Sequence, residues 1–460
     1  MRNYLLYGGM VMGLSVATSV LAADPTKEDL QKEIDALKAK VDQLEQTQQQ
    51  QAITTRADVD ATVKAVLQDA DRRSQLMQME GFTAGWTDGK FILQSGDGNY
   101  LIHPYAQFQL RNTTTWRENG KQPNDTDDVQ NGFEVRRAKV GVEGNAFGPN
   151  LTYQFQMQFD RKSGTPGLED AWVRYKFSPQ FSLRAGQFKD PFAHESLLSS
   201  KKFLAAERDY TNDYFSSGDD YVQGVSLIYD AKGPLHAELA FTDGSDFAVA
   251  SGVRNNFDQN FQDFGTNNAD YGGAGRVEYL AMGDWKDYDS FSAYGAKSDL
   301  LVFGAGLDYT ESGNTGFFSQ TVDVQYKMTN GLALYAAAYG RYTKNSPAAI
   351  DAPGTTPAAL HDLYDWGVVA QASYMLNPKL EVFGRYGYLD IDSDGLAAGA
   401  SNHIHEITAG ANYYFVGHNA KLTLDGGYLP NGAPIADDGA GILASRNDEF
   451  YLRCQFQLLL

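Results

Sequence analysis

The chain has 460 residues, of which 46 are glycine and 13% are aromatic, and its formal net charge is −20. Its mean hydropathy is below zero, which excludes a bundle of membrane helices but not a β-barrel, where only alternate strand residues meet lipid. The negative charge argues against nucleic acid as a partner, because phosphate binding needs a basic surface.

The first 22 residues have the pattern of a secretory signal peptide. They begin with Arg2, continue through a mostly apolar stretch and end with Val20 and Ala22 at the small-residue positions of a cleavage site. No later apolar run is long enough to cross a membrane as a helix. We therefore expect residues 1–22 to be removed and the mature chain to act in the periplasm or beyond.

Residues 23–80 are predicted to form a helical stalk. Apolar residues recur there at alternating spacings of four and three, the pattern of a coiled-coil seam: Leu30, Ile34, Leu37, Val41 and Leu44. The alternative is a single amphipathic helix that lies on another part of the protein. Glutamines 48–51 interrupt the seam, a second helical pattern follows, and the helical region ends near Gly81.

From residue 100 onward the pattern changes to strict alternation of apolar and polar residues. The clearest run is Leu151 to Phe159, where Tyr153, Phe155 and Met157 share one parity with the two end residues and three glutamines share the other. A period of two places these sets on opposite faces of a β-strand. Because the polar face of residues 133–192 carries Arg, Lys and Gln, we interpret it as a barrel wall with lipid outside and water inside.

Sixteen such runs are predicted, at about 100–117, 133–147, 151–161, 168–178, 181–192, 222–230, 235–243, 271–282, 300–310, 317–328, 332–343, 362–376, 380–391, 403–415, 420–430 and 448–460. The connections after odd-numbered runs are mostly long and those after even-numbered runs mostly short, which is the asymmetry of an outer-membrane barrel. The connection at 283–299 is an exception. Either it is an unusual excursion on the side of the short turns, or the strand count is off by one pair there.

Three segments in this region, RRAKVGVEGNAFG, LEDAWVRYKF and SLRAGQFKDPF, resemble the phosphate-selective porin (porin O and P) family of Gram-negative outer membranes. The resemblance extends from about residue 80 to the C-terminus. It agrees with the fold that the spacing and the sixteen runs predict, an all-β fold with a 16-stranded antiparallel transmembrane β-barrel at 81–460 preceded by an N-terminal α-helical coiled-coil segment. It also implies a homotrimer in the cell outer membrane, with the stalk in the periplasm.

Parity and the resemblance together indicate where ion selectivity would reside. A basic strip is expected on the inner face of strands that become neighbours when the barrel closes: Arg111, Arg137, Lys139, Arg174, Lys176, Arg184 and Arg453. The third long connection lies where trimeric porins place the loop that narrows the pore, and its expected bases are Lys189, Lys201, Lys202 and Arg208.

The opposite arc of the predicted barrel is more acidic, with inward residues Asp308, Asp323, Glu381, Glu406 and Asp425. A basic strip facing an acidic arc would create a field across the pore and draw anions along the bases. The alternative is that the bases mainly pair with neighbouring acids such as Glu143, Asp160 and Asp170, and so stiffen the wall.

The sequence therefore favours an outer-membrane porin for passive diffusion of small hydrophilic solutes, with anions such as phosphate as the expected cargo. The alternative is a structural anchor or cell-wall tether, with a coiled-coil stalk and a weakly selective or plugged barrel. We expect no enzyme and no cofactor, since none of the seven histidines lies in a nucleophile motif. His403 and His405 share a strand face but have no identifiable third metal ligand.

Overall fold

The structure is a computed structural model, and it describes residues 31–32, 34–47, 61–68, 81–87, 89–118, 129–216, 221–244, 269–347, 360–396, 400–445 and 447–460. The chain divides into two compact units, Met1–Met79 and Glu80–Leu460, and each is considered by itself. The predicted signal peptide lies outside the described residues.

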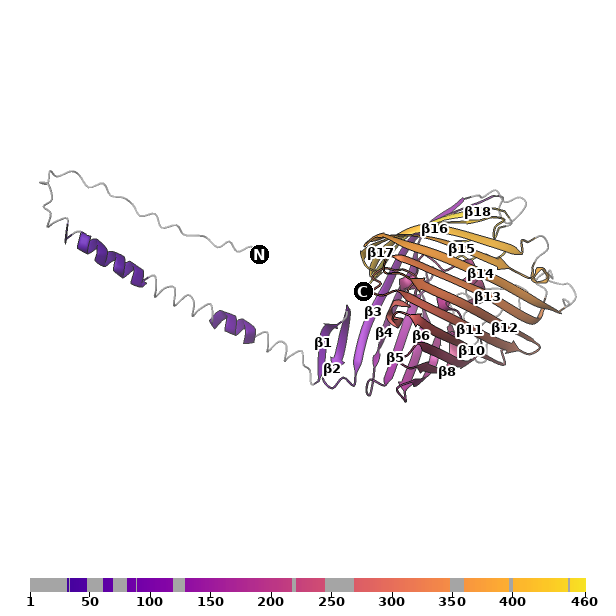
Figure 1. Cartoon of the computed structure of the whole chain (residues 1–460), viewed down its shortest axis with the longest axis horizontal. Helices are drawn as coiled ribbons and strands as arrows, with labels where there is room; N and C mark the ends of the chain where they lie inside the picture. Colours follow the sequence, from indigo (N-terminus) through magenta and orange to yellow (C-terminus); the bar gives the residue numbers. More distant parts are fainter. Residues whose placement is uncertain are drawn as a thin grey trace. The chain divides into compact units, whose positions relative to one another are not determined.

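Two helical segments are described in the first unit, over residues 31–47 apart from residue 33 and over residues 61–68 (Figure 1). The apolar seam of the first segment is exposed in the single chain at Ile34, Leu37, Val41 and Leu44. A coiled coil needs partner helices to cover such a seam, so it stays a prediction. Among the described residues, no helix is both long and apolar enough to cross a membrane.

The second unit contains a closed antiparallel barrel, and the predicted count of sixteen strands is confirmed (Figure 1). The last strand pairs with the first in register, for example Gln455 with Arg111. The barrel strands are β3 (Leu101–Arg117), β4 (Val129–Asn145), β5 (Leu151–Phe159), β6 (Pro166–Lys176), β7 (Phe181–Lys189), β8 (Tyr221–Asp230), β9 (Leu235–Thr242), β10 (Tyr271–Met282), β11 (Leu300–Ser312), β12 (Thr315–Lys327), β13 (Leu332–Pro347), β14 (Leu360–Asn377), β15 (Leu380–Asp390), β16 (His403–Val416), β17 (Ala420–Leu429) and β18 (Glu449–Leu459).

The barrel wall has its apolar residues outside and its polar residues inside. Phe155 on β5 is 41% exposed, whereas the next residue, Gln156, is 7% exposed. On β3 the same inversion places Phe108 and Leu110 on the exposed face and Gln109 inside. This is the reverse of a soluble protein and matches the orientation that the alternation predicted.

Connections at the two ends of the barrel differ in length. At one end, here the loop end, lie the mostly long connections such as that between β7 and β8. At the other, here the turn end, most are short, as at residues 378–379 between β14 and β15. The connection at 283–299 also lies at the turn end. Strand β10 is hydrogen-bonded directly to β9 on one side and to β11 on the other, so no strands are missing between them. It is therefore an excursion, and the strand count is right.

A hairpin of β1 (Phe82–Thr87) and β2 (Lys90–Ser95) precedes the barrel. It joins the barrel through two pairs, Leu93 with Ile102 and Gln94 with Leu101. These pairs lie at the turn end of β3, beyond the last residue of β3 that pairs with β18. The hairpin therefore continues the sheet past the rim of the closed barrel.

Candidate functional site

The connection between β7 and β8 folds into the barrel instead of leaving it, and is called here the inner loop (190–216 of the described residues). It contains α2 (His194–Leu197), η1 (Ser200–Lys202) and α3 (Tyr210–Ser216), and most of its side chains are buried. The loop turns inward directly after β7, where the Lys189 ammonium donates hydrogen bonds to the Ser196 and Leu198 carbonyl oxygens. The interior of the barrel is thus narrowed by a segment of the chain itself.

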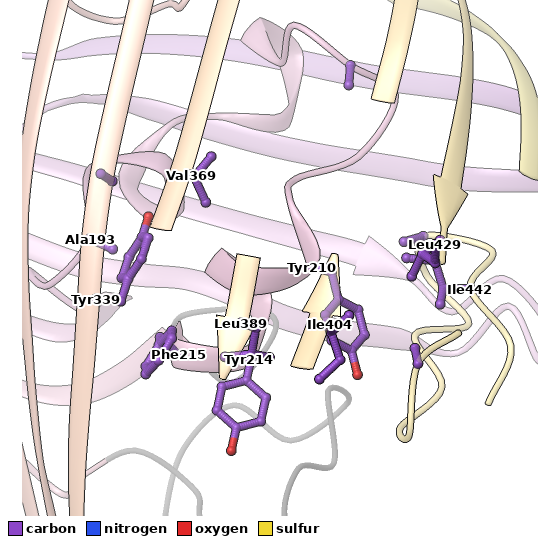
Figure 2. Close-up of a cluster of buried hydrophobic side chains, with 14 of the residues drawn as sticks. Ala193, Tyr210, Tyr214, Phe215, Tyr339, Val369, Leu389, Ile404, Leu429 and Ile442 are labelled. Atoms are coloured by element: carbon purple, nitrogen blue, oxygen red, sulfur yellow. The ribbon is translucent and has the colours of Figure 1, made fainter. Parts of the chain in front are cut away.

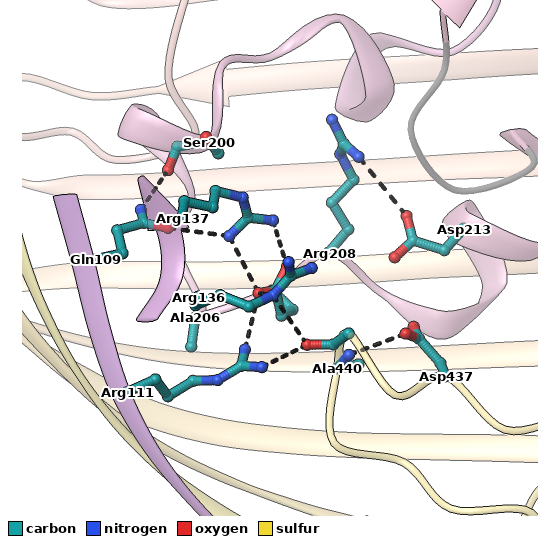
Figure 3. A network of polar contacts seen from close by, with 12 residues as sticks. Gln109, Arg111, Arg136, Arg137, Ser200, Ala206, Arg208, Asp213, Asp437 and Ala440 are labelled. Carbon is teal, nitrogen blue, oxygen red and sulfur yellow. Dashed lines mark hydrogen bonds and ion pairs between the residues drawn. The ribbon is translucent and has the colours of Figure 1, made fainter. Parts of the chain in front are cut away.

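A cluster of three arginines anchors the inner loop to β3 and β4 (Figure 3). The Glu207 carboxylate lies 2.7 Å from Arg111, 2.6 Å from Arg136 and 2.7 Å from Arg137. Burial alone would raise the pKa of Glu207, but the three guanidinium groups hold this pKa well below its usual range. Glu207 therefore stays ionised and neutralises part of the positive charge predicted for this wall.

Strands β15–β17, which lie on the other side of β18 from β3, hold the same stretch of the loop by its backbone. Arg385 on β15 donates to the carbonyl oxygens of Glu207 and Arg208, at 2.9 and 3.0 Å. The Ala206 amide donates to the Asp425 carboxylate of β17 at 2.7 Å, and the Tyr210 amide donates to the Glu406 carboxylate of β16 at 2.8 Å. Charge-assisted bonds of this kind are stronger than neutral ones, so the loop is held along the arc of the wall that runs from β15 through β18 to β4.

An apolar cluster fills the side of the interior next to β13–β17. Phe215 of the inner loop stacks on Tyr339 of β13 with ring centroids 5.3 Å apart, and Figure 2 shows Val369, Leu389 and Ile404 from the neighbouring strands in the same cluster. These residues occupy inward positions where simple alternation predicts polar side chains. The apolar residues at inward positions of these strands were the sequence signal for the cluster. The sequence analysis named only the acids on this arc and so did not predict the cluster.

The excursion at 283–299, here the inner turn, enters the barrel from the turn end and meets the inner loop. Its Tyr288 ring stacks on His194 with centroids 4.0 Å apart, and Phe291 lies 4.3 Å from Tyr335 of β13. Both aromatic side chains are buried. The inner turn therefore completes the filling of this side of the interior.

The other side of the interior keeps an open space, here the side cavity. It has a volume of about 380 Å³ and lies between the inner loop and strands β3–β8. Tyrosine, tryptophan, glutamine and serine side chains contribute to its lining. Six bases and three acids line it: Arg137, Lys139, Arg184, Lys189, Lys201 and Arg208, with Glu143, Glu169 and Asp170.

Five of the eleven predicted site residues do not line the side cavity. Arg111 and Arg453 are fully buried, and Arg453 pairs with Asp425 at 2.8 Å. Arg174 binds the Ser182 hydroxyl, Lys176 lies at the turn end of β6, and Lys202 reaches the inner turn. Parity placed the barrel bases on the inner face, but only some of the inner face borders open space.

Most bases of the side cavity form ion pairs, though not with the acids that the sequence suggested. Lys139 pairs with Glu169 at 2.6 Å, and Arg184 pairs with Glu238. Arg137 pairs with Glu207, as described above.

The three acids that the sequence suggested have other contacts. Glu143 binds Lys90 at 2.7 Å, and Asp160 accepts bonds from its own turn. Asp170 accepts hydrogen bonds from Gln154 and Trp172.

Lys201 is a different kind of base. Its ammonium lies 3.9 Å from the centroid of the Tyr105 ring, a cation–π contact, and no ion pair among the described residues includes it. Burial lowers the pKa of Lys201 to about 8, so the side chain is mostly charged at pH 7. Its carbonyl oxygen accepts a bond from Gln457, which fixes the loop at this point.

The structure describes no group of three or more metal-ligating side chains among the residues that it covers. His403 and His405 contact tyrosine hydroxyls of β15, at 3.0 and 2.9 Å. The sequence reasoning also missed several members of the site. Glu207, Arg136 and Tyr105 gave no local signal of their roles, and the unusual length of the inner turn did not show that it enters the barrel, because both depend on where the two inner segments run.

A closed barrel with an apolar outer face, a charged interior and an inward-folded loop defines an outer-membrane channel. The family described as phosphate-selective porin O and P matches residues 116–425, and the chain belongs to this family. A comparison with the curated proteins finds no match.

Solved structures that share the fold include two outer-membrane proteins. The outer membrane channel DcaP of Acinetobacter baumannii is 11% identical, with a TM-score of 0.51 over 79% of this chain and 99% of that chain. OmpF of Salmonella typhi, solved in complex with daunomycin, is 15% identical, with a TM-score of 0.50 over 78% of this chain and 98% of that chain.

The predictions of family, barrel and location are therefore confirmed: the protein is a porin of the outer membrane, a channel for passive diffusion. In such barrels the short turns face the periplasm and the long loops face outward. The inner loop therefore enters from the outside, and the inner turn enters from the periplasm.

Proposed function

We propose that the porin prefers small anions such as phosphate and that they pass through the side cavity. The observation that carries this proposal is the composition of the cavity, where six bases face three acids. A narrow, low-dielectric passage focuses the field of such an excess and raises the local concentration of anions. The anion would pass close to Lys201, the base that forms no ion pair among the described residues.

Most of the other bases of the side cavity form ion pairs that weaken their hold on a passing anion, which is favourable for conduction. Lys139 and Arg184 each share their charge with a carboxylate, so neither would hold an anion tightly. Conduction requires sites strong enough to replace part of the hydration shell of an ion and weak enough to release it. A series of half-neutralised bases meets both requirements better than one strong trap.

The size of the cavity supports small solutes. Its volume of about 380 Å³ is at the low end of the roughly 300–1,000 Å³ typical of small-molecule pockets, and the surrounding wall is pinned by buried ion pairs. A phosphate ion with part of its hydration shell fits such a space. Larger solutes would require the inner loop to move.

The test is planar-bilayer recording across a potassium chloride gradient. Lys201→Glu should move the reversal potential toward cation preference and weaken block by titrated phosphate. Lys379→Glu, at an exposed turn between β14 and β15, is the matched charge-reversal control and should leave both quantities unchanged. Equal reversal potentials for the wild type and Lys201→Glu would refute the proposal.

We further propose that the protein forms a homotrimer and that the stalk stabilises it. The exposed seam at Ile34, Leu37, Val41 and Leu44 supports this, because isolated helices of this length are marginal in water. Deleting residues 24–51 should leave single-channel conductance intact while lowering the temperature at which trimers dissociate on gels. Lost conductance would mean that the segment belongs to the pore.

The second candidate function is a structural anchor, in which the barrel only holds the stalk in the outer membrane, with a contact to the cell wall. The filled side of the interior favours it, because the inner loop and the inner turn occupy much of the space that the described strands enclose. Bilayer recording separates the two: an anchor with a plugged barrel gives no conductance steps, whereas a trimeric pore gives them in threes.

A further inference from the structure

The β1–β2 hairpin has two chemically different faces. Cross-strand partners share a face, and the register pairs Trp86 with Phe91 and Ala84 with Leu93. Leu93 in turn pairs with Ile102, which lies on the exposed outer face of β3. The aromatic face of the hairpin, including Trp86 at 72% exposure, therefore continues the lipid-facing surface of the barrel.

The opposite face of the hairpin points to the inside of the channel. Lys90 has the other parity on β2, and its ammonium lies 2.7 Å from the Glu143 carboxylate of β4. The ring of His103 lies 3.0 Å from the same carboxylate oxygen and pairs in register with Glu143. A residue outside the sixteen barrel strands thus reaches a residue that lines the side cavity.

The Lys90–Glu143 contact affects the charge of the side cavity because of where Glu143 lies. Glu143 lies near the periplasmic end of β4, on the same part of the wall as Tyr105, over which the Lys201 ammonium sits. The three residues line the side cavity where it approaches the periplasm. Without a partner, a carboxylate there would oppose the field that Lys201 creates for anions.

The Lys90–Glu143 pair remains in contact with water, since the two side chains are 53% and 35% exposed. Exposed ion pairs contribute little to folding stability, so the main effect of Lys90 is on local charge. The hairpin is held in place by its backbone pairs with β3 and by its apolar outer face rather than by this pair.

We propose that the β1–β2 hairpin forms the periplasmic rim of the channel and that Lys90 sets the ion preference at the exit by neutralising Glu143. The proposal assigns a pore role to a segment that precedes the barrel. It rests on the proposed passage of anions through the side cavity, and it adds the residue that determines the charge at the end of that path.

Charge substitutions at the two positions test the proposal by reversal potential in a salt gradient. Lys90→Gln should shift the full-length channel toward cation preference, and Glu143→Gln should shift it by a similar amount toward anion preference. The double variant carries the same net charge at the exit as the wild type and should return to its value. Lys379→Gln, at another periplasmic turn, is the matched control and should cause no shift.

Several outcomes would overturn the hairpin role. A Lys90→Gln channel identical to the wild type would place Lys90 outside the ion path, and shifts of the same sign in both single variants would mean that the hairpin acts on the fold. Failure of the proposed function looks different. If the wild type prefers cations while the two single variants still shift the reversal potential in opposite directions, the proposed anion preference is wrong. The role of the hairpin at the periplasmic rim is then still supported.

Discussion

The two sides of the barrel interior contrast sharply although the same wall surrounds them. The side along β3–β8 keeps a cavity of about 380 Å³ lined by charges and amides. The side along β13–β17 is filled by Phe215, Tyr339, Phe291 and their neighbours in one apolar cluster. The interior is open where the wall presents polar side chains to the inner segments, and it is filled where the wall presents apolar ones.

The difference originates in the inward residues of the strands. On β5 these are glutamines such as Gln154 and Gln156, which bind water or ions without attracting apolar side chains. On β13 they include Tyr335, Ala337 and Tyr339. Burial of apolar surface stabilises contact with an aromatic-rich loop only at the second wall, so the loop packs there and leaves space at the first.

The largest effect is expected from removing the inner turn. Replacing residues 285–297 with an Asn-Gly turn takes Tyr288 and Phe291 out of the interior and should raise single-channel conductance severalfold, because conductance grows with open cross-section. Phe291→Leu, which keeps a bulky apolar side chain, is the control and should change little. Unchanged conductance in a heat-stable trimer would mean that the inner loop alone closes the filled side.

Glu207→Gln should loosen the inner loop. Breaking a buried ion pair by removing one partner costs roughly 3–5 kcal/mol, and here three guanidinium groups lose the Glu207 carboxylate, although Arg111 keeps its pair with Glu134. We expect noisier single-channel currents and frequent changes of conductance level. Asp213→Asn is the control in the same loop, because its carboxylate lies 3.9 Å from Arg208, and it should have a smaller effect.

The same anchor has a defined response to acid. The pKa of Glu207 is held well below its usual value of about 4.3, so the stabilisation is present at neutral pH and is lost only as the pH falls through the lowered value. Channel noise should therefore stay low at pH 4 and rise only in stronger acid. A rise already near pH 5 would contradict the anchor.

A smaller effect is expected from titrating Lys201 on the open side. Its pKa of about 8 means that the ammonium loses its proton as the pH rises from 7 to 9, and anion preference should decline over that range. Reversal potentials measured from pH 6 to pH 9.5 test this. Lys201→Gln should show lower anion preference throughout and no step near pH 8; a step that persists would come from another group.

The smallest effect is expected at the solvent-exposed ion pair between the inner loop and the inner turn. Lys202 and Asp289 lie 3.2 Å apart, but the Asp289 side chain is 62% exposed. Such pairs contribute about 0–1 kcal/mol, so Asp289→Asn should leave trimer stability unchanged and shift the reversal potential slightly toward anions. A large loss of stability would show that this contact, rather than the apolar cluster, joins the inner turn to the inner loop.

Strand alternation alone was sufficient to predict the barrel. The alternation predicted a strand at about 151–161 where β5 spans Leu151–Phe159, and the same local rule located all sixteen strands within a few residues. It also placed Arg137 and Lys139 inside, because residues two apart in a strand face the same way whatever the rest of the chain does. Strand parity is a local property, so it can be read without the fold.

Which inward charges border open space depends on contacts between distant parts of the chain. Arg111 and Glu207 are 96 residues apart in the sequence, and they are in contact because the inner loop passes Arg111 inside the barrel. The same holds for Lys90 and Glu143, which meet because the hairpin continues the edge of β3. Such pairings depend on the path of a loop through a closed space, and that path follows from packing between distant residues rather than from the order of neighbouring ones.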